Sequence, residues 1–302
     1  MHRTKGRSLE RLGWWKSCKG TIMKLEHYTV FAAAPNGGKH IAVCDEPNLG
    51  GEAMQAIARE SKASLTAFVL GEENGNVQIR FFTPQKEKSE SDSGALVVAE
   101  HRWRKGLVEV FMTADMNGDI LRVSGFGHGG YWFSEQGQTT TVPLEISEPQ
   151  ILASLGLNAD DLHSDFKIGA AGSSKTNIIV AVQTPSLLDA IKPNLEAIKA
   201  LNIETKTNGL IVFSPDQTRG TDFELRFFAP AKGITEDNAG SFTIASLCGY
   251  LVANQKFEGT LQLSFSQGFA MTKPSKLEAR FTALNSQAVK IRVGGEVIRI
   301  ET

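Results

Sequence analysis

The sequence predicts an α+β protein built from two similar halves, each a curled mixed sheet around a central apolar helix. Three observations lead to this prediction. A segment near residue 80 recurs near residue 226, each copy contains an alternating strand that stops at a proline, and each copy continues into a run of helical length. A chain of 302 residues has room for two domains of ordinary size.

The repeat is clear when residues 80–99 and 226–245 are aligned at a shift of 146 positions without a gap. Eight of the twenty positions are identical, where chance would give about one or two. We therefore expect an internal duplication. The identical pairs are Arg80/Arg226, Phe81/Phe227, Phe82/Phe228, Pro84/Pro230, Lys86/Lys232, Glu90/Glu236, Gly94/Gly240 and Ala99/Ala245.

Each repeat reads as a strand, a turn and a helix. Residues 77–82 and 223–228 alternate as half-buried strands, and each is stopped by a proline two residues later. A polar turn then leads to Gly94 or Gly240, where we expect a helix to begin. The run after Gly240 has almost no charged face, which predicts a helix buried on all sides.

The expected domains are residues 23–143 together with 286–302, and residues 144–285, with the final strand returning to the first domain. Residues 1–22 carry six basic residues, one acid and a Trp14-Trp15 pair, and they lack the apolar stretch of a secretory signal. We expect them to be an extension outside the fold. A short basic-aromatic segment for a membrane surface, or a transit segment, is the alternative.

The charge, the apolar content and the cysteines and histidines of the sequence indicate which binding partners and which compartment to expect. With 32 basic and 33 acidic residues the net charge is −1, which gives no basic surplus for nucleic acid or an anionic membrane. No window has the 18 apolar residues of a membrane-spanning helix. The three cysteines lie far apart in no CxxC pair, which favours a reducing cytoplasm. The histidines show no close metal-binding pair.

The two helix starts are the candidate binding site. A helix N-terminus presents unpaired amide hydrogens and a partial positive charge, and glycine lets an anion approach the backbone. Two such starts, related by duplication, can face each other across a cleft. A small carboxylated molecule held there would have groups of both halves on its two faces, an arrangement suited to proton transfer.

These motifs resemble the phenazine-biosynthesis PhzF-like isomerase family, which has the diaminopimelate-epimerase-like fold of two pseudo-symmetric halves. The resemblance covers almost the whole chain from about Lys24. It is carried by TVFAAAPNGGKHIAVCDE, EAMQAIARESKASLTAFVL, RFFTPQKE, RFFAPAKGITEDNAGS (like the family's EDPATGS signature), QGFAMTKPSKL and KIRVGGEVIRI. It implies cofactor-free isomerase chemistry without metal, and a homodimer.

The sequence departs from the family pattern where the chemistry is carried. The acid/base glutamate of the family's SET motif is replaced by Leu65, within Ser64-Leu65-Thr66. The family's GH dipeptide is here Asp92-Ser93, and the Asn-Pro of its glycine turn is Lys39-His40. Glu87, Asp237, Gly240 and Ser241 survive, although EDNAGS is one residue shorter than EDPATGS.

Two hypotheses follow from this loss. Either proton transfer has moved to Asp92 and Asp237, two carboxylates on one cleft whose mutual repulsion raises one pKa, or the chain binds an anionic metabolite without turning it over. The expected catalytic residues are Asp237 and Asp92. The expected substrate-binding residues are Ser64, Ser93, Gly94, Gly240, Ser241 and Lys39.

Overall fold

The computed structural model describes residues 14–16, 22–215, 217–255 and 257–301, and these fall into two compact units. The first unit contains the described residues up to 30, residues 39–134 and those from 295 on. The second contains residues 31–38 and 135–294. Residues 31–38, 135–143 and 286–294 thus lie in the second unit, whereas the expected domains put them in the first.

Most of the N-terminal extension lies outside the described residues. Within it, β1 (Trp14–Lys16) pairs antiparallel with β2 (Ile22–Lys24).

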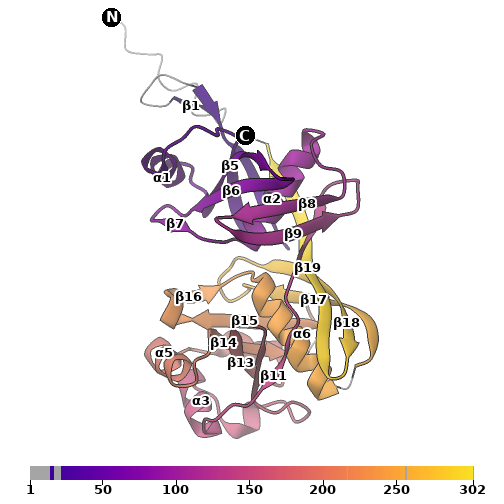
Figure 1. Ribbon diagram of the computed structural model, residues 1–302. Coiled ribbons are helices and arrows are strands. Elements are labelled where there is room, and N and C mark those ends of the chain that lie inside the picture. Colours follow the sequence, from indigo (N-terminus) through magenta and orange to yellow (C-terminus); the bar gives the residue numbers. More distant parts are fainter. Residues whose placement is uncertain (1–13, 17–21, 216, 256, 302) are drawn as a thin grey trace, which may run out of the picture. The chain divides into compact units, whose positions relative to one another are not determined.

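The first unit is a curved sheet around one helix, with a second helix on its outer surface (Figure 1). The strand order is β19-β3-β4-β5-β6-β8-β9-β10, with β7 beside β6, and β10 pairs back with β19, which closes the sheet. Its elements are β3 (Glu26–Val30), β4 (Lys39–Cys44), α1 (Gly51–Glu60), β5 (Leu65–Glu73), β6 (Asn76–Phe82), β7 (Glu87–Lys88), α2 (Asp92–Arg104), β8 (Phe111–Met116), β9 (Asp119–Gly125), β10 (Tyr131–Glu135) and the end of β19 (Gln287–Ile300).

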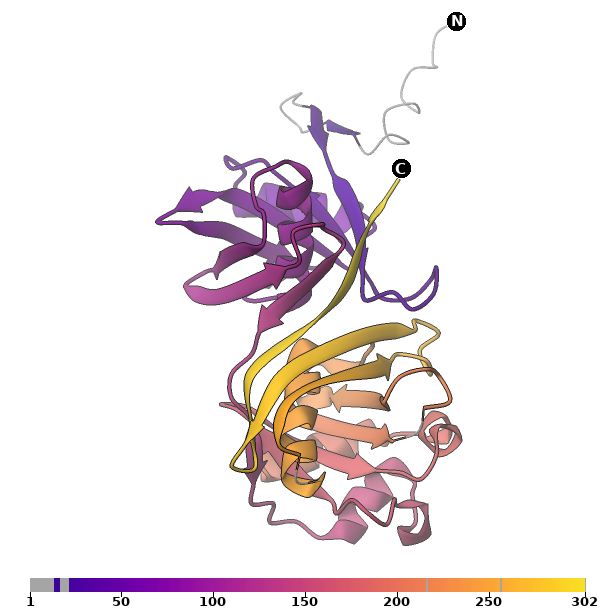
Figure 2. The ribbon, with the colours of Figure 1, turned by 90° about the vertical axis from the view of Figure 1, so that its right-hand side faces the viewer.

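The second unit has the same plan with more helices on its outer surface (Figures 1 and 2). The strand order is β11-β12-β13-β14-β15-β17-β18-β19, with β16 beside β15, and a bridge from Thr139 to Ala288 of β19 closes the sheet. Its elements are β11 (Thr140–Val142), α3 (Glu148–Leu155), η2 (Ala159–Asp161), β12 (Gly169–Gly172), β13 (Thr176–Ala181), α4 (Pro185–Ala190), α5 (Leu195–Glu204), β14 (Gly209–Ser214), β15 (Phe223–Ala229), η3 (Pro230–Lys232), β16 (Ile234–Asp237), α6 (Ser241–Gln255), β17 (Gly259–Gln267) and β18 (Ser275–Leu284).

The strand pairings of the two units correspond one to one. β3–β4 is antiparallel, β4–β5 parallel, β5–β6 antiparallel and β6–β8 parallel. The same succession recurs as β12–β13, β13–β14, β14–β15 and β15–β17. Parallel neighbours require a crossover, and α2 and α6 form the crossovers from β6 to β8 and from β15 to β17.

Both central helices are buried, but only α6 is without charged residues, because α2 buries Glu100 and His101. Residues 93–101 of α2 are all buried, as are most residues of α6 up to Val252. A helix that is apolar all round is stable only where packing surrounds it. A separate apolar layer lies between α1 and the outer surface of the first sheet, and it includes Met54, Ile57 and Phe68.

One side-chain arrangement occurs in both repeats. Arg80 makes two hydrogen bonds to Glu87, of 2.7 and 2.8 Å, and its guanidinium lies 5.2 Å from the ring centre of Phe82. Likewise, Arg226 makes two 2.9 Å hydrogen bonds to Glu236 and lies 5.0 Å from the ring of Phe228. The spatial counterpart of Glu236 is therefore Glu87, and the gapless sequence alignment was wrong to pair Glu236 with Glu90.

Candidate functional site

The start of α6 is held by a buried glutamine. Gln267, at the end of β17, has no exposed surface. Its Nε2 donates to the carbonyl oxygen of Asp237 at 2.6 Å, and its Oε1 accepts from the amide of Gly240 at 3.3 Å. One side chain thus fixes both ends of the short connection between β16 and α6.

The carboxylate of Asp237 lies against the first turn of α6. A Cβ atom on Gly240 would lie 3.1 Å from Asp237 Oδ2 and 2.8 Å from Thr243 Oγ1, so a larger residue here would have to displace these side chains. Ser241 follows it and is 5% exposed, and its Oγ has no hydrogen-bond partner among the described residues. A buried hydroxyl without a partner costs free energy unless a ligand or water satisfies it. The structure therefore brings Asp237, Gly240 and Ser241 together.

The glycine turn before β4 packs beside this helix start. Asn238 Nδ2 donates to the carbonyl oxygen of Gly38 at 2.7 Å, and a Cβ atom on Gly37 would lie 1.9 Å from the carbonyl oxygen of Pro274. Only glycine fits this approach. Lys39, the next residue after the turn, begins β4 of the first unit and is half-buried.

The start of α2 has a different construction. The helix begins at Asp92. The sequence predicted its start at Gly94, two residues later. Ser91 is the N-cap, and its Oγ accepts from the amide of Gly94 at 3.2 Å. Asp92 is half-buried, and Ser93 is buried with its Oγ 3.3 Å from that of Ser91.

Leu65 packs against this helix start. It begins β5, is 7% exposed, and its Cδ2 would lie 3.1 Å from a Cβ atom built on Gly94. The Phe81 ring would lie at 2.4 Å from the same Cβ atom. Just before Leu65, the amide and the hydroxyl of Ser64 both donate to the carbonyl oxygen of His40, at 3.0 and 2.7 Å. The two side chains that pack on Gly94, Leu65 and Phe81, are thus apolar, and neither can transfer a proton.

The expected residues are thus distributed over two helix starts. Asp92, Ser93 and Gly94 share the α2 start with Leu65, and Ser64 adjoins Leu65 in sequence. That the two starts serve one ligand stays a prediction. Sequence reasoning missed Gln267 and Asn238. Both lie in segments that it quoted as family motifs, but an amide side chain at a strand end carries no distinguishing pattern.

A histidine pair on β3 and β4 was also missed. His27 Nδ1 and His40 Nε2 are 2.9 Å apart. Burial, and secondly the neighbouring His40, lowers the pKa of His27 to about 4, and burial lowers the pKa of His40 as well. Both rings are therefore neutral at physiological pH, and one donates to the other.

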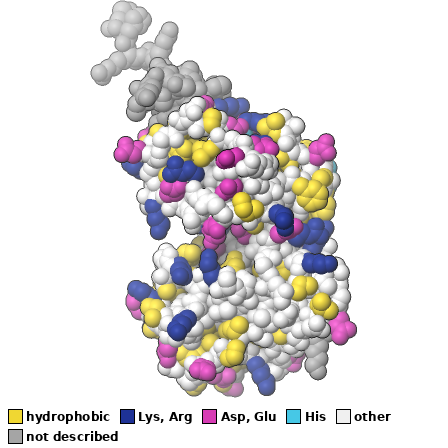
Figure 3. Space-filling model, viewed as in Figure 1, with side chains coloured by type: hydrophobic (Ala, Val, Ile, Leu, Met, Phe, Trp, Pro, Cys, Tyr) yellow, Lys and Arg dark blue, Asp and Glu magenta, His cyan; other side chains and the backbone are white. Residues whose placement is uncertain are grey.

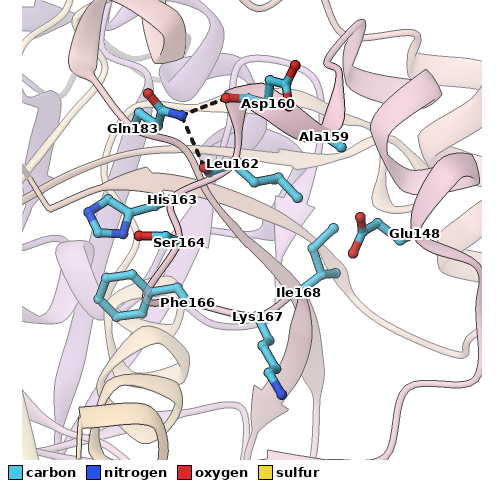
Figure 4. A pocket seen from close by; sticks show the side chains of 10 residues that line it. All are labelled: Glu148, Ala159, Asp160, Leu162, His163, Ser164, Phe166, Lys167, Ile168 and Gln183. Carbon is cyan, nitrogen blue, oxygen red and sulfur yellow. Dashed lines mark hydrogen bonds between the residues drawn. The ribbon is translucent and has the colours of Figure 1, made fainter.

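A surface pocket of about 800 Å³ in the second unit lies apart from these residues (Figure 4). The side chain of Lys167 points away from that of Glu148 in this view, and His163 Nδ1 accepts from the amide of Asp165 at 3.2 Å. None of the predicted site residues lines it. The lining residues are Glu148, Ala159, Asp160, Leu162, His163, Ser164, Phe166, Lys167, Ile168 and Gln183.

No group of three or more His, Cys, Asp or Glu side chains is arranged to hold a metal ion within the described part of the chain. Cys44 and Cys248 are buried, and burial raises the pKa of both thiols, that of Cys44 to about 12. Both thiols stay protonated and pack as core residues. No helix in the described ranges is long and apolar enough to span a membrane.

The sequence and the fold of this chain are both similar to those of one protein family. A family profile described as PhzC-PhzF, phenazine biosynthesis-like protein, matches residues 28–302. An uncharacterised isomerase, YddE of Salmonella typhimurium, is 29% identical over 91% of this chain and 95% of its own length. The trans-2,3-dihydro-3-hydroxyanthranilate isomerase of Pseudomonas aeruginosa is 26% identical over 88% and 92%. A crystal structure of a PhzF-family phenazine biosynthesis protein from Bacillus anthracis superposes with a TM-score of 0.79, covering 91% of this chain and 96% of that one, at 21% identity.

Proposed function

Because the chain belongs to the phenazine biosynthesis-like PhzC-PhzF family, we propose that it is an isomerase that moves a proton within a small carboxylated metabolite without metal or organic cofactor. Curated relatives that match nearly their full length are named isomerases, and one is named for trans-2,3-dihydro-3-hydroxyanthranilate. The matching strand pairings of the two units support a duplication, from which the two helix starts derive.

The observation that carries this proposal is the start of α6. Its amides, the unpaired hydroxyl of Ser241 and the approach allowed by Gly240 together form a donor set for a carboxylate. The carboxylate of the metabolite would satisfy Ser241 Oγ. Lys39, Ser64, Ser93 and Gly94 are the proposed binding residues of the other half.

Asp237 is the proposed acid/base. It would take a proton from a carbon of the metabolite, forming an O–H bond as the C–H bond breaks. The electron pair left on the metabolite would delocalise toward its carboxyl group, where the helix-start donors stabilise the developing negative charge. Asp237 then returns the proton to a different carbon, and Asp92 is the proposed second carboxylate. No atom is gained or lost, as an isomerisation requires.

Binding without turnover is the second candidate, and the environment of Leu65 favours it. Leucine stands where the family carries its acid/base glutamate, and it is packed against Gly94 among apolar side chains. A protein with this wall and an intact α6 start would still hold an anion.

Solvent exchange distinguishes the two candidates. The full-length protein would be incubated in D₂O with trans-2,3-dihydro-3-hydroxyanthranilate and a panel of small carboxylates, and deuterium uptake followed by mass spectrometry. Isomerase activity predicts exchange that Asp237→Asn reduces at least 100-fold with binding retained. Asp119→Asn, at an exposed position on β9, is the control and should exchange like the parent.

Binding alone predicts no exchange in any variant, and affinity that Gly240→Val removes. Leu65→Glu, compared with Leu65→Gln, then tests whether the missing glutamate is the whole cause. If the parent protein neither exchanges nor binds any of these carboxylates, both candidates fail.

A further inference from the structure

Two histidines on neighbouring strands face each other on the outer surface of the first sheet. Because His40 of β4 pairs with Thr29, two residues after His27 of β3, the two histidines are diagonal neighbours on one side of the sheet. The hydroxyl of Tyr28 lies 3.0 Å from the ring of His101 in α2, so the adjacent His27 points to the surface opposite α2. Both histidines are half-buried, and an ion can reach them from solvent.

The ring of His40 is held in one tautomer. Burial lowers the pKa of His40, and a hydrogen bond to the backbone of Lys62 raises it in part, as happens when the ring donates to a carbonyl oxygen. A neutral imidazole has one donor and one acceptor nitrogen, so the other nitrogen presents a lone pair. His40 Nε2 is the nitrogen that faces His27 Nδ1, at 2.9 Å. Histidines that bind metal are oriented in the same way, with one ring nitrogen donating to the protein and the other facing the ion.

We propose that His27 and His40 together bind a divalent transition-metal ion, and that copper(II) is held most tightly. An imidazole nitrogen binds such an ion at about 2.0–2.1 Å. Two nitrogens at this distance, in adjacent corners of a square, lie about 2.9 Å apart, which is the separation of the two ring nitrogens in the structure. At the tetrahedral angles that zinc prefers, they would lie about 3.3 Å apart. A rotation of the rings that directs both lone pairs to one point is therefore sufficient, and the strands need not separate.

The chemistry of the two ligands also favours copper. Imidazole nitrogens suit copper, nickel and zinc, whereas calcium and magnesium take oxygen ligands. For a given nitrogen site, affinity along the first-row metals is highest at copper and falls again at zinc. Within the described ranges no third His, Cys, Asp or Glu side chain joins the pair, so water molecules complete the coordination.

Protonation of the pair does not oppose metal binding near pH 7. Burial keeps both rings neutral there, so the ion does not compete with a charged imidazolium. On binding, His27 loses the proton that Nδ1 donates to His40 and takes one up on Nε2. The two histidines therefore stay neutral, and no net proton is released.

Titration of the full-length protein with copper(II) tests this site. We expect isothermal titration to show one ion per histidine pair, and electron paramagnetic resonance to show a tetragonal copper signal with hyperfine structure from two nitrogen atoms. His27→Gln and His40→Gln should each weaken binding at least about tenfold and remove one of these nitrogens from the signal. Zinc should bind more weakly than copper, and magnesium should not bind. The Tm of the parent protein, but not of either variant, should rise with copper(II) concentration.

The chain has six histidines, so other copper sites need controls. His128→Gln, at an exposed position, should bind copper like the parent protein. His2→Gln controls for copper bound by the first residues of the chain. Figure 3 shows acidic and basic side chains interspersed on the face that it presents, so diffuse accumulation of cations is not expected there. Circular dichroism melts without metal should show that all the variants fold.

Three outcomes would overturn the proposal. The first is a parent protein that binds no copper(II) at molar excess, and the second is copper binding that both His27→Gln and His40→Gln retain. The third is a signal with only one nitrogen ligand in the parent protein, because it would assign the ion to a single histidine. None of these measurements uses a substrate, so their outcome is independent of the proposed isomerase activity.

Discussion

The starts of α2 and α6 occupy equivalent places in the two units, but they are built differently. At α2, a serine side chain caps the helix and two apolar side chains, Leu65 and Phe81, pack on its glycine. At α6, a glutamine holds the helix start from the neighbouring strand and a buried serine hydroxyl is left without a partner among the described residues. The first start is satisfied by its own unit, whereas the second has unused hydrogen-bonding capacity. Anion binding is therefore expected to depend mainly on α6.

The largest effect should come from Gln267→Leu. This change leaves the buried Gly240 amide and Asp237 carbonyl unpaired, and each costs about 1–3 kcal/mol. The free energy of unfolding, measured with urea, should fall by the sum of these two costs. Carboxylate affinity should also be lost. Gln262→Leu, at an exposed position on the same strand, is the control. Unchanged affinity in a folded Gln267→Leu variant would contradict the assigned role of the α6 start.

Gly94→Ala should have the second-largest effect, which is a loss of stability. The added Cβ would meet the Phe81 ring at 2.4 Å, and overpacking of this kind costs about 1–3 kcal/mol. Chemical denaturation measures the loss. Gly50→Ala is the matched control, because a Cβ there meets nothing within 4 Å. Equal stability of the two variants would show that the α2 start is less tightly packed than described.

The two serines give the sharpest contrast. Ser91→Ala removes a helix cap and should cost about 1 kcal/mol of stability. Ser241→Ala removes a hydroxyl without a partner, so stability should change by less than about 0.5 kcal/mol while carboxylate affinity falls several-fold. Denaturation and isothermal titration measure the two quantities. If Ser91→Ala weakened binding more than Ser241→Ala, the anion site would have to be reassigned to α2.

The smallest effect concerns pH and the first unit. The pKa of His27 is lowered to about 4 from 6.5, so the unfolded chain takes up a proton that the folded chain resists. Above pH 6.5, where His27 is neutral in both states, the free energy of unfolding is unaffected by it. As the pH falls from 6.5 toward 4, the unfolded chain gains the proton first and the free energy of unfolding decreases. With solvent screening, this amounts to about 1 kcal/mol, or roughly 2–4 °C in Tm between pH 7.5 and 5. His27→Gln should remove that part of the Tm difference, and the exposed His128→Gln should not.

The sequence predicted those parts of the fold that leave a local pattern. The strands before the prolines follow from side-chain period, the buried α6 follows from its lack of charged residues, and these elements were located to within a few residues. The sequence analysis placed the start of α2 at Gly94, the glycine that the repeat shares with Gly240. The helix begins earlier, because Ser91 caps it. The pairing of Glu236 with Glu90 failed because Glu87 lies seven residues after Arg80, whereas Glu236 lies ten residues after Arg226, a difference that a gapless alignment cannot represent.

The candidate site was less predictable than the fold. Asp237, Gly240 and Ser241 could be proposed from the sequence because they form one short motif, and the structure places them together at the start of α6. Gln267 lies nearly thirty residues further along the chain, and only the pairing of β15 with β17 brings it back to the α6 start. A contact between residues far apart in the chain produces no pattern in the sequence around either residue.

The assignment of β19 to both units has a consequence for synthesis on the ribosome. Residues 287–294 belong to the second unit, and residues 295–300, which pair with β3 and complete the first sheet, come after them. The N-terminal half therefore cannot finish folding when its own continuous segment emerges. Until the whole segment of the second unit has been translated, β3 presents an open edge that chaperones can recognise and that can pair with a neighbouring nascent chain.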